Sequence, residues 1–490
     1  MPAYTITPQD VLMFRDGRPM EGGLSGHGAR WPEPSVIFDA LHAALHRAFP
    51  AERKEEFQAW EHSHRYGRSS DRDMNRDRTQ RFGSLATAGP FPALDGEWFF
   101  PCPQDVTVED RLEPTLYPLK ENAGRNDLPN PLVYPLASRA EPTKAQPKPW
   151  WNKAAIEAYL AGKAEALAAR LRDNDDFFGS EWVTGIAIDP ETLTTGQGEA
   201  EGKIYSAEYL RLRDGVTLGI HATMPMKNGQ PGARVERITE LFPAQKKRTI
   251  IVGGQQRSCQ VEEAKADGKP APLDQLLPVS PPIAGRRVKW LLLSPAVYPA
   301  IRADAAKGIS AHSGGWLPNW IAPSDDYAVR QGDREVRVEK GRVLLKLPIP
   351  RNNLSRDEWR KRVREAPFLN CRLVAARIPK PIVLTGWTEA LHLKDTPIAR
   401  EHGPRPTLLA VPAGAVYYFE GPDAPRLAEV LSWHGATPDP TDPSAPSAPP
   451  TIRNRRSTLL GEKGYGLGVC GPWQFFPDPT NPPDPSCQSD

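Results

Sequence analysis

Hydrophobic and polar positions alternate at the start of the chain and then give way to an apolar run. Residues 3–14 begin with alternating Tyr4 and Ile6 and continue into Val11-Leu-Met-Phe14, a pattern that predicts a strand. Ser35 is then placed to cap a helix whose apolar residues fall on one face, namely Val36, Ile37, Ala40, Leu41, Ala44, Leu45 and Ala48. A strand followed by an amphipathic helix indicates the opening of an α+β unit.

Three more patterned segments complete the first half. A stretch of strong helix formers follows Asn152 and predicts a helix from about Lys153 to Arg172. Two alternating runs flank Asp214-Gly215, which favours a β-hairpin with a tight type I′ turn. A further apolar run at 249–252, continuing to Val261, predicts another strand.

The second half repeats this order of elements. Ser355-Arg-Asp-Glu358 is a capping box that opens a basic helix. The other predicted elements are strands at 288–293, 372–378 and 415–420, a helix from Asp423 to Trp433, and a closing strand within 469–476. Two βαββαβ halves predict an α+β protein made of two ferredoxin-like, RRM-type domains, which we place at residues 1–284 and 285–476.

Three segments interrupt or follow these domains. Residues 53–81 are polar and arginine-rich, which is typical of a charged surface insert. Residues 436–450 contain six prolines and almost no apolar side chains, so we expect a disordered insert there. Residues 477–490 continue in the same manner and are expected to form a disordered tail.

Composition restricts the class of protein. The net charge is only +2, so any nucleic-acid contact must come from local clusters of cations. The five cysteines include no CxxC pair, which argues against both a zinc site and a disulfide framework. No run approaches the ~20 apolar residues that span a bilayer, and the N-terminus does not resemble a signal peptide. We therefore expect a cytoplasmic protein with no membrane partner, metal or cofactor.

A glycine-rich stretch near the C-terminus combines cations, glycines and one aromatic residue. Residues 451–471 carry a net charge of +3, with Arg455, Arg456 and Lys463 preceding or flanking Gly464, Tyr465, Gly466 and Gly468. Glycines can adopt positive φ and turn backbone N–H groups toward one ligand. We interpret the stretch as a phosphate-binding loop in which Tyr465 offers a face to a base. The alternative is a glycine-rich hairpin that only closes a sheet.

The same stretch matches the dinucleotide fingerprint GxGxxG at residues 466–471. That fingerprint has meaning only between a strand and a helix early in a βαβ unit. Here Pro472-Trp473 and a proline-rich tail follow. We therefore interpret the match as a false positive.

Further candidate residues lie along the first half. Arg15 and Arg18 follow the first predicted strand, and Arg257 follows two glycines. His27, beside Arg30 and Trp31, is the best candidate for a general base in RNA cleavage. Its alternative role is that of a loop residue that contacts RNA or a neighbouring subunit. The basic helix has a net charge of +4 over residues 351–364, which suits either RNA or the face of another subunit.

An ordered series of short segments resembles the RAMP proteins of CRISPR systems, and more narrowly the family of the third subunit of the Cmr complex, the type III-B RNA-guided effector. The resemblance spans the chain apart from its inserts and rests on these segments: Phe14-Arg-Asp-Gly-Arg-Pro19, Gly89-Pro90-Phe91, Trp98-Phe-Phe-Pro-Cys-Pro-Gln-Asp105, Val252-Gly-Gly-Gln-Gln-Arg257, Leu292-Leu-Ser-Pro-Ala296, Gly314-Gly-Trp-Leu-Pro318, Gly386-Trp387, Lys394 and Val411-Pro-Ala-Gly-Ala-Val-Tyr-Tyr-Phe419.

The chain also departs from the family pattern in places. Asp39-Ala-Leu-His42 stands where the family usually has Gly-Ala-Leu-Arg, and Gln255 stands where an acidic residue is common. The proline-rich insert is unusually long. At residue 42 a histidine therefore stands where the resemblance implies an arginine contact from the first helix.

The resemblance implies a role. Such a subunit holds the 5′ handle of the CRISPR RNA and contacts the large polymerase-like subunit and the RAMP backbone of the effector, without cleaving RNA itself. Our leading hypothesis is therefore a non-catalytic RNA-binding subunit in antiviral defence. The alternatives are a metal-independent RAMP endoribonuclease with His27 as base, and an assembly subunit that touches protein only. The expected RNA-binding residues are Arg15, Arg18, His27, Arg30, Trp31, Arg257, Arg455, Arg456, Lys463, Gly464, Tyr465, Gly466 and Gly468.

Overall fold

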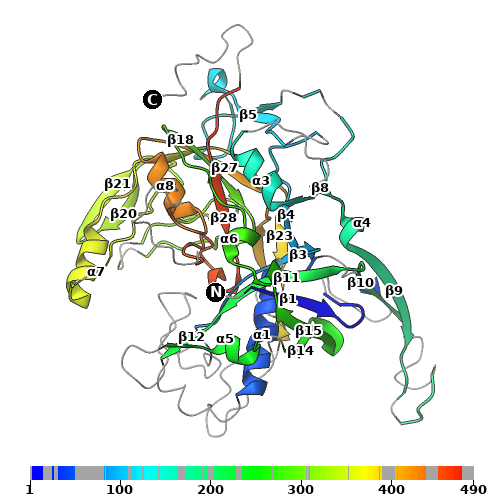
Figure 1. The fold of residues 1–490 in the computed structure, drawn as a ribbon. Helices are drawn as coiled ribbons and strands as arrows, with labels where there is room; N and C mark the ends of the chain where they lie inside the picture. The colour runs from blue at the N-terminus through cyan, green and yellow to red at the C-terminus, as the bar shows by residue number, and fades with distance from the viewer. Residues whose placement is uncertain are drawn as a thin grey trace.

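The structure is a computed structural model of the 490-residue chain. It describes residues 3–14, 25–26, 31–49, 82, 84–108, 112–123, 126–138, 140–141, 143–162, 171–189, 191–195, 204–227, 234–244, 246–266, 269–304, 306, 309–350, 353–385, 387–388, 403–404, 407–436 and 451–476. Two antiparallel sheets form the centre of the molecule, and helices pack on them (Figure 1). The expectation of a mixed α+β protein is confirmed.

The first sheet has eight strands in the order β14-β15-β1-β11-β3-β4-β7-β8, and every neighbouring pair is antiparallel. Its strands are β1 Ala3–Pro8, β3 Ala86–Leu94, β4 Glu97–Pro101, β7 Trp150–Asn152, β8 Leu171–Arg172, β11 Val216–Thr223, β14 Arg248–Val252 and β15 Arg257–Glu263. Helix α1, Pro34–Ala48, lies between β1 and β3 in the chain and buries Ile37, Phe38, Leu41 and Leu45 against this sheet. Its amphipathic pattern was visible in the sequence.

The second sheet has four strands in the order β22-β27-β18-β28, again all antiparallel. Its strands are β18 Arg287–Leu292, β22 Arg372–Arg377, β27 Val416–Glu420 and β28 Gly468–Gly471. Helix α8, Ala424–Leu431, packs on it through Leu427, Val430 and Leu431. The expected closing strand over 469–476 is wrong in its second part, because Pro472 lacks an N–H and the chain leaves the sheet after Gly471.

Short elements surround the two sheets. Helix α3, Lys153–Leu160, begins at Asn152, whose side chain accepts a hydrogen bond from the Ala155 N–H. The others are β2 Ser25–Gly26, β5 Leu116–Pro118, β6 Leu136–Ser138, β12 Pro225–Lys227, β13 Arg234–Glu236, β16 Lys265–Ala266, β17 Lys269–Pro270, β19 Ala296–Val297, β23 Ile382–Leu384, β24 Trp387–Thr388, β25 Gly403–Pro404, β26 Leu408–Val411, α4 Asn174–Phe177, α5 Arg237–Leu241, α6 Leu273–Leu276, and the 3₁₀ turns η4 Lys120–Asn122, η7 Gly254–Gln256 and η9 Gly461–Lys463.

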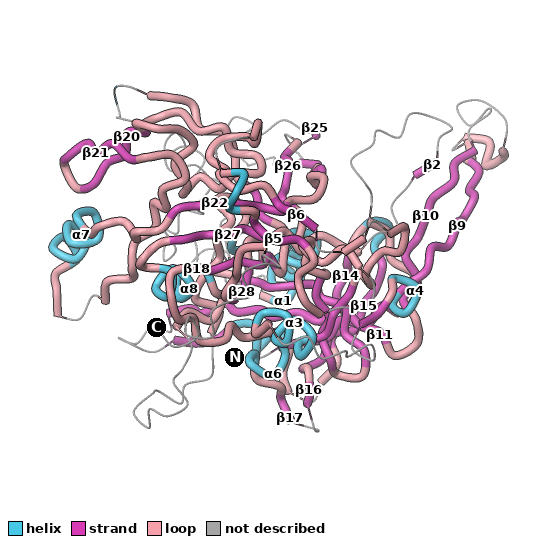
Figure 2. The backbone as a smooth tube through the Cα atoms, turned by 90° about the horizontal axis from the view of Figure 1, so that it is seen from above, coloured by secondary structure: helices cyan, strands magenta, loops and turns pink. Residues whose placement is uncertain are grey.

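Two projections extend from opposite sides of this body (Figure 2). One is the ribbon formed by β9, Phe178–Ile186, and β10, Ile204–Leu212. The other carries the strand pair β20 Tyr327–Gln331 and β21 Arg334–Val338 together with helix α7, Arg356–Glu365. None of the α7 residues is buried, whereas α1 buries six.

The expected hairpin around Asp214-Gly215 is wrong. The turn is present, with Gly215 at φ +78°, but the strands on its two sides do not pair with each other. Strand β10 pairs with β9 in the ribbon, while β11 enters the first sheet between β1 and β3. The turn signal is local, whereas strand pairing is decided by which apolar faces find a core.

The two halves share a hydrophobic core. One cluster contains Trp98 and Trp151 from the first half together with Tyr418 and Trp433 from the second. A buried polar group lies between the halves as well. The Asp105 carboxylate accepts hydrogen bonds from the Tyr159 and Tyr418 hydroxyls at 2.8 and 2.7 Å.

A buried lysine completes this polar group. The Lys289 ammonium lies 3.9 Å from the Asp105 carboxylate and 3.6 Å from the centre of the Tyr159 ring. Burial lowers the pKa of Lys289 to about 8, and the neighbouring carboxylate only partly opposes this shift. Each member therefore has a polar partner, as buried polar groups require.

The expected inserts at 53–81 and 436–450 and the tail at 477–490 lie outside the described residues, apart from Ala436. The proposed domain boundary at 284/285 stays a prediction. Within the described part of the chain, no helix is long and apolar enough to cross a membrane.

Candidate nucleic-acid interface

The Gly-rich loop, residues 461–468, reaches across to the first half of the molecule. Gly464 and Gly466 have φ values of +98° and +76°, which side chains other than hydrogen rarely tolerate. A Cβ on Gly464 would lie 3.3 Å from Pro34 and from Ala88, both in the first half. A Cβ on Gly466 would lie 2.0 Å from the Ser457 backbone nitrogen. Glycine is therefore required by close approach of protein to protein.

Most backbone N–H groups of this loop are already used inside the protein. Those of Lys463 and Gly464 donate to the carbonyls of Leu460 and Gly461, and that of Gly466 donates to Pro295. The Leu467 N–H donates to the Ser294 hydroxyl at 2.9 Å. The expected row of donors turned toward one ligand is therefore wrong.

Polar side chains in and next to the Gly-rich loop form contacts between the two halves. The Lys463 ammonium lies 2.7 Å from the Asp39 carboxylate on α1 and 4.8 Å from the centre of the Phe38 ring. Arg455 donates to the carbonyl of Thr87 in β3 at 3.3 Å. Asp39, which departs from the family pattern, is thus matched by a lysine from the other half.

Tyr465 does not present an open ring face. Its side chain is fully buried among apolar residues, and its hydroxyl lies 3.2 Å from that of Ser35 at the start of α1. Burial raises its pKa well above the ordinary range. The expectation that Tyr465 offers a face to a base is therefore wrong for this conformation.

Arg456 and Gly468 also have internal roles. The Arg456 guanidinium donates to the Val430 carbonyl near the end of α8 at 2.6 Å and to the Asn454 side chain at 2.9 Å. It therefore satisfies a helix-terminal carbonyl, a common role for arginine. Gly468 begins β28, where a Cβ would lie 2.2 Å from the Trp290 indole nitrogen. The alternative interpretation, a glycine-rich segment that closes a sheet, describes this stretch better.

A carboxyl group lies beneath the same contact. Glu33 precedes α1, and its Oε2 is buried with no hydrogen-bond partner among the described residues. Burial raises the pKa of Glu33 to about 7. The junction between α1 and the Gly-rich loop therefore contains a group that titrates near neutral pH.

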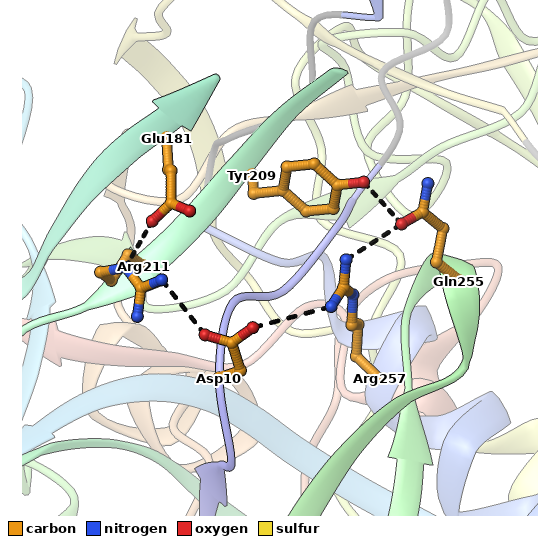
Figure 3. Close-up of polar contacts among 6 residues, drawn as sticks. All are labelled: Asp10, Glu181, Tyr209, Arg211, Gln255 and Arg257. Carbon is orange, nitrogen blue, oxygen red and sulfur yellow. Dashed lines mark hydrogen bonds and ion pairs between the residues drawn. The ribbon is translucent and has the colours of Figure 1, made fainter. Parts of the chain in front are cut away.

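Arg257 lies in a different environment, a polar network at the root of the ribbon (Figure 3). The Arg257 guanidinium stacks on the ring of Tyr209 at 4.8 Å from its centre. It donates to the Gln255 side-chain oxygen at 3.0 Å, and the Tyr209 hydroxyl donates to the same oxygen at 2.6 Å. Asp10 lies 3.8 Å from Arg257 and 3.1 Å from Arg211.

The network joins four segments of the chain. Asp10 follows β1, Gln255 and Arg257 belong to the turn and strand after β14, and Tyr209 and Arg211 lie on β10, where Arg211 also pairs with Glu181 of β9. Two arginines and two carboxylates balance in charge, so the network carries no net charge. The Arg257 side chain keeps 28% of its surface exposed, which leaves it able to reach a ligand.

The turn before Arg257 is held against the start of the N-terminal loop. Gly253 has φ +72°, and a Cβ there would lie 2.6 Å from the Met13 carbonyl. The Gly254 N–H donates to that same carbonyl at 2.9 Å. The described chain stops at Phe14, so Arg15 and Arg18, like His27 and Arg30, lie outside the described residues.

Trp31 lies near the opposite side of the ribbon root. Its indole N–H donates to the Pro90 carbonyl at 2.8 Å. Its ring meets Trp150 edge-on at 5.8 Å and Phe178 at 5.9 Å between centres. Trp31 therefore supports the joint between the ribbon and the body, and it is half-buried there.

The sequence-predicted cations thus divide into two groups. Arg455 and Lys463 contact the first half across the junction, and Arg456 contacts residues of the second half. Arg257 instead remains partly open beside the ribbon. Sequence reasoning missed Asp10, Glu181, Tyr209 and Arg211, because nothing in the chain signals that β10 pairs with β9. Among the described residues, no group of three or more His, Cys, Asp or Glu side chains could hold a metal ion.

Comparisons with known proteins place the chain in a family. No curated protein matches it. Among solved structures, a chain of the cryo-EM structure of the type III-B Cmr-beta bound to cognate target RNA is 14% identical, with coverage of 85% of this chain and 86% of that one and a TM-score of 0.32. A chain of the Csm3–Csm4 subcomplex of the type III-A CRISPR–Cas interference complex is 9% identical, with coverage of 86% and 94% and a TM-score of 0.30. Residues 4–473 match the family model described as CRISPR-associated protein (Cas_Cmr3). The chain therefore belongs to the Cas_Cmr3 family, and its resemblance to the third subunit of the Cmr effector is confirmed.

Proposed function

We propose that this chain is a non-catalytic subunit that holds the 5′ handle of the CRISPR RNA in a type III-B effector and joins the large polymerase-like subunit to the RAMP backbone. The observation that carries the proposal is the family match over residues 4–473. The match spans both sheets and the junction between them, so the proposal concerns the whole described fold and not one half of it.

Each half is, in this proposal, a ferredoxin-like RAMP domain. A βαββαβ unit places its strands in the order 4-1-3-2, all antiparallel. The strands β15-β1-β11-β3 in the first half follow this order, with α1 after the first strand. The strands β28-β18-β27-β22 follow it in the second half, with α7 and α8 in the two helical positions.

The Arg257 network supports an RNA contact at the root of the ribbon. An arginine stacked on an aromatic ring can pair with a phosphate through its edge or extend the stack to a base. Arg257 combines this stacking with partial exposure. The turn that precedes Arg257 also contacts Phe14, and in the sequence Arg15 and Arg18 follow Phe14.

Two of the described histidines, His312 and His434, already use their ring nitrogens inside the fold, which supports the non-catalytic part of this proposal. The His312 ring accepts a hydrogen bond from the Gly314 N–H and contacts the Ile321 carbonyl at 2.9 Å each. His434 accepts from the Ser280 N–H at 3.1 Å, and burial lowers its pKa to about 4. Ring nitrogens that serve the backbone are poor general bases.

The test is the RNA content of effector complexes purified from the native host through a tag on this chain. We expect Arg257→Ala to reduce handle-containing RNA about tenfold while the other subunits remain bound, since a charged, stacked contact is worth about 1–3 kcal/mol. Arg257→Lys should retain only part of the RNA, because lysine keeps the charge but not the planar stack.

The matched control is Arg248→Ala, an exposed arginine at the far end of the same strand pair. It should leave the RNA content unchanged. If Arg257→Ala and Arg248→Ala retain equal RNA, the contact at the ribbon root is wrong. If the purified wild-type chain cuts repeat RNA into a discrete product, the non-catalytic role is wrong.

A further inference from the structure

A basic pocket lies at one end of the second sheet, away from the Arg257 network. Its cavity has a volume of about 740 Å³. Five cationic side chains and two carboxylates line it, a net charge of +3: Arg286, Arg287, Lys340, Arg342 and Arg372, with Glu339 and Glu420. Asn370 and Phe475 complete the polar and aromatic parts of the wall.

The register of the sheet explains why these charges gather. Arg287 on β18 and Arg372 on β22 are both direct partners of Glu420 on β27, and Arg342 is bridged to Arg372. Directly opposite residues on antiparallel strands project from the same face with Cβ atoms about 4.5–5.5 Å apart. Three arginines and one glutamate therefore form a row across four adjacent segments.

The single carboxylate in this row does not neutralise its neighbours. Glu420 accepts from the Arg372 guanidinium at 3.0 Å through Nε and again through Nη2, and the Tyr134 hydroxyl lies 3.5 Å from it. Arg342 and Arg372 remain opposite each other, and like charges in that position destabilise a sheet. An anion bound between them would remove this repulsion.

Neighbouring residues also hold the guanidinium groups in place, but these contacts use only some of the N–H donors of each arginine. Arg342 donates to the Asn370 side chain, and the Arg287 guanidinium lies 5.6 and 5.3 Å from the ring centres of Trp473 and Phe475. Arginine has five N–H donors, so one or two contacts leave several for a ligand. Arg286 and Lys340 make no side-chain hydrogen bond or ion pair with other described residues, and they add two positive charges to the wall.

We propose that this pocket binds phosphate groups of the RNA strand that the effector carries. Fixed guanidinium groups match phosphate oxygens in pairs, while a lysine adds a point charge. The identification of the ligand as RNA rests on the function proposed above, but the phosphate chemistry rests on the pocket alone. A free nucleotide or pyrophosphate would satisfy the same donors, so the experiment separates the two sources.

The experiment measures binding of a fluorescent single-stranded RNA to the full-length chain between 50 and 300 mM salt. The pocket variant is Arg286→Glu with Lys340→Glu, two side chains that hold no other described residue in place. We expect about tenfold weaker binding at 100 mM salt and a salt slope reduced by about 1.4, from about 0.7 per lost phosphate contact. The charge-matched control, Lys246→Glu with Lys247→Glu, lies on the first half and should change binding less than threefold.

A second measurement tests directly whether RNA covers the arginines of the pocket. Phenylglyoxal modifies accessible arginines, and mass spectrometry gives the extent at Arg286, Arg287 and Arg342. RNA should protect these arginines at least threefold in the wild-type chain, while thermal melting confirms that the variants fold.

The outcomes separate the two proposals. Equal weakening by pocket and control variants, or no protection by RNA, overturns the RNA assignment. Protection by pyrophosphate alone identifies a free phosphate ligand and overturns the RNA source. If the wild-type chain binds no RNA but pyrophosphate protects the pocket arginines, the proposed function is contradicted and the phosphate-binding pocket is supported.

Discussion

Helices α1 and α7 occupy the same place in the order of their two halves, α1 between strands β1 and β3 and α7 between strands β18 and β22, yet they have opposite environments. Helix α1 buries Ile37, Phe38, Leu41 and Leu45 in the core of the first half. Helix α7 buries no residue and lies at the margin of the molecule in both views (Figures 1 and 2). One helix exists because it packs, and the other must exist for local reasons.

Those local reasons are contacts at the two ends of α7. The Ser355 hydroxyl accepts from the Glu358 N–H at 3.3 Å, and the Glu358 carboxylate accepts from Ser355 in return. At the other end, the Lys346 ammonium donates to the Val363 and Arg364 carbonyls at 3.2 and 2.6 Å. Isolated helices of ten residues are marginal in water, so these caps are needed. Strong end contacts can thus hold a helix outside a core and leave its arginines exposed.

The largest expected difference between the helices is the cost of removing an apolar side chain. Leu41→Ala opens a cavity in the first core and should lower the free energy of unfolding by about 2–5 kcal/mol. Val363→Ala, on the half-buried side of α7, should cost less than about 1 kcal/mol. Urea denaturation of the two variants measures both values. Equal losses would mean that α7 packs as tightly as α1.

The Gly-rich loop touches α1, whereas no hydrogen bond or ion pair among the described residues joins it to α7. Gly466→Ala tests this asymmetry. The added methyl group would overlap the Ser457 backbone at a φ of +76°, so we expect a cost of about 2–4 kcal/mol. Hydrogen exchange should rise at the start of α1 and stay unchanged in α7.

Gly461→Ala is the matched control in the same loop. Its Cβ would make an ordinary 3.5 Å contact with Arg455, and its φ is not positive. This variant should leave exchange in both helices unaltered. Faster exchange in α7 after Gly466→Ala would show that the loop acts on the whole fold and not on α1.

The pH dependence of α1 should differ from that of α7 because of Glu33. The folded state raises the pKa of this carboxyl from 4.5 to about 7, so the folded form holds its proton longer than the unfolded chain. The resulting stability is complete below about pH 4.5 and is lost as the pH rises through about 7. Between pH 5 and 7.5 the wild type should lose about 2 kcal/mol more than Glu33→Gln. Parallel pH curves for the two proteins would contradict the burial of this carboxyl.

The smallest expected effect concerns the cap of α7. Ser355→Ala removes the hydroxyl that accepts from Glu358 and should cost about 1 kcal/mol of local helix stability. Because α7 contributes no buried residue, the global unfolding midpoint should hardly move. Exchange of the α7 amides should rise several-fold. A large shift of the global midpoint would show that α7 unfolds together with the sheet.

The sequence predicted elements well where the signal was local. The apolar face of α1 and the capping box of α7 appear directly in the pattern of residues, and both helices are present. The predicted cap of α1 is wrong, because the helix begins at Pro34 and its N-cap residue is Glu33 instead of Ser35. The sequence could not tell that α7 lies outside the core, because a capping box carries no information about packing. The Asp214-Gly215 turn is present, but the partner of β10 depends on β9, whose residues carry no distinctive alternation.

The candidate site was predicted less well for a related reason. Glycines at 464 and 466 do require positive φ, as the pattern indicated. The pattern does not say whether protein or ligand comes close to them, and here protein does. The cations Lys463 and Arg455 were attributed to phosphate binding, whereas their partners, Asp39 and Thr87, lie more than three hundred residues away in sequence.

That separation has a consequence for biosynthesis. The hydroxyls of Ser35 and Tyr465, 430 residues apart, meet across the junction. At ordinary translation rates of about 5–20 residues per second, about 20–90 s pass between the synthesis of the two. During this interval the start of α1 is made but lacks its cover. We therefore expect a nascent or prematurely terminated chain to expose the Asp39 side of α1, a surface by which a cell's quality control could distinguish unfinished chains from finished ones.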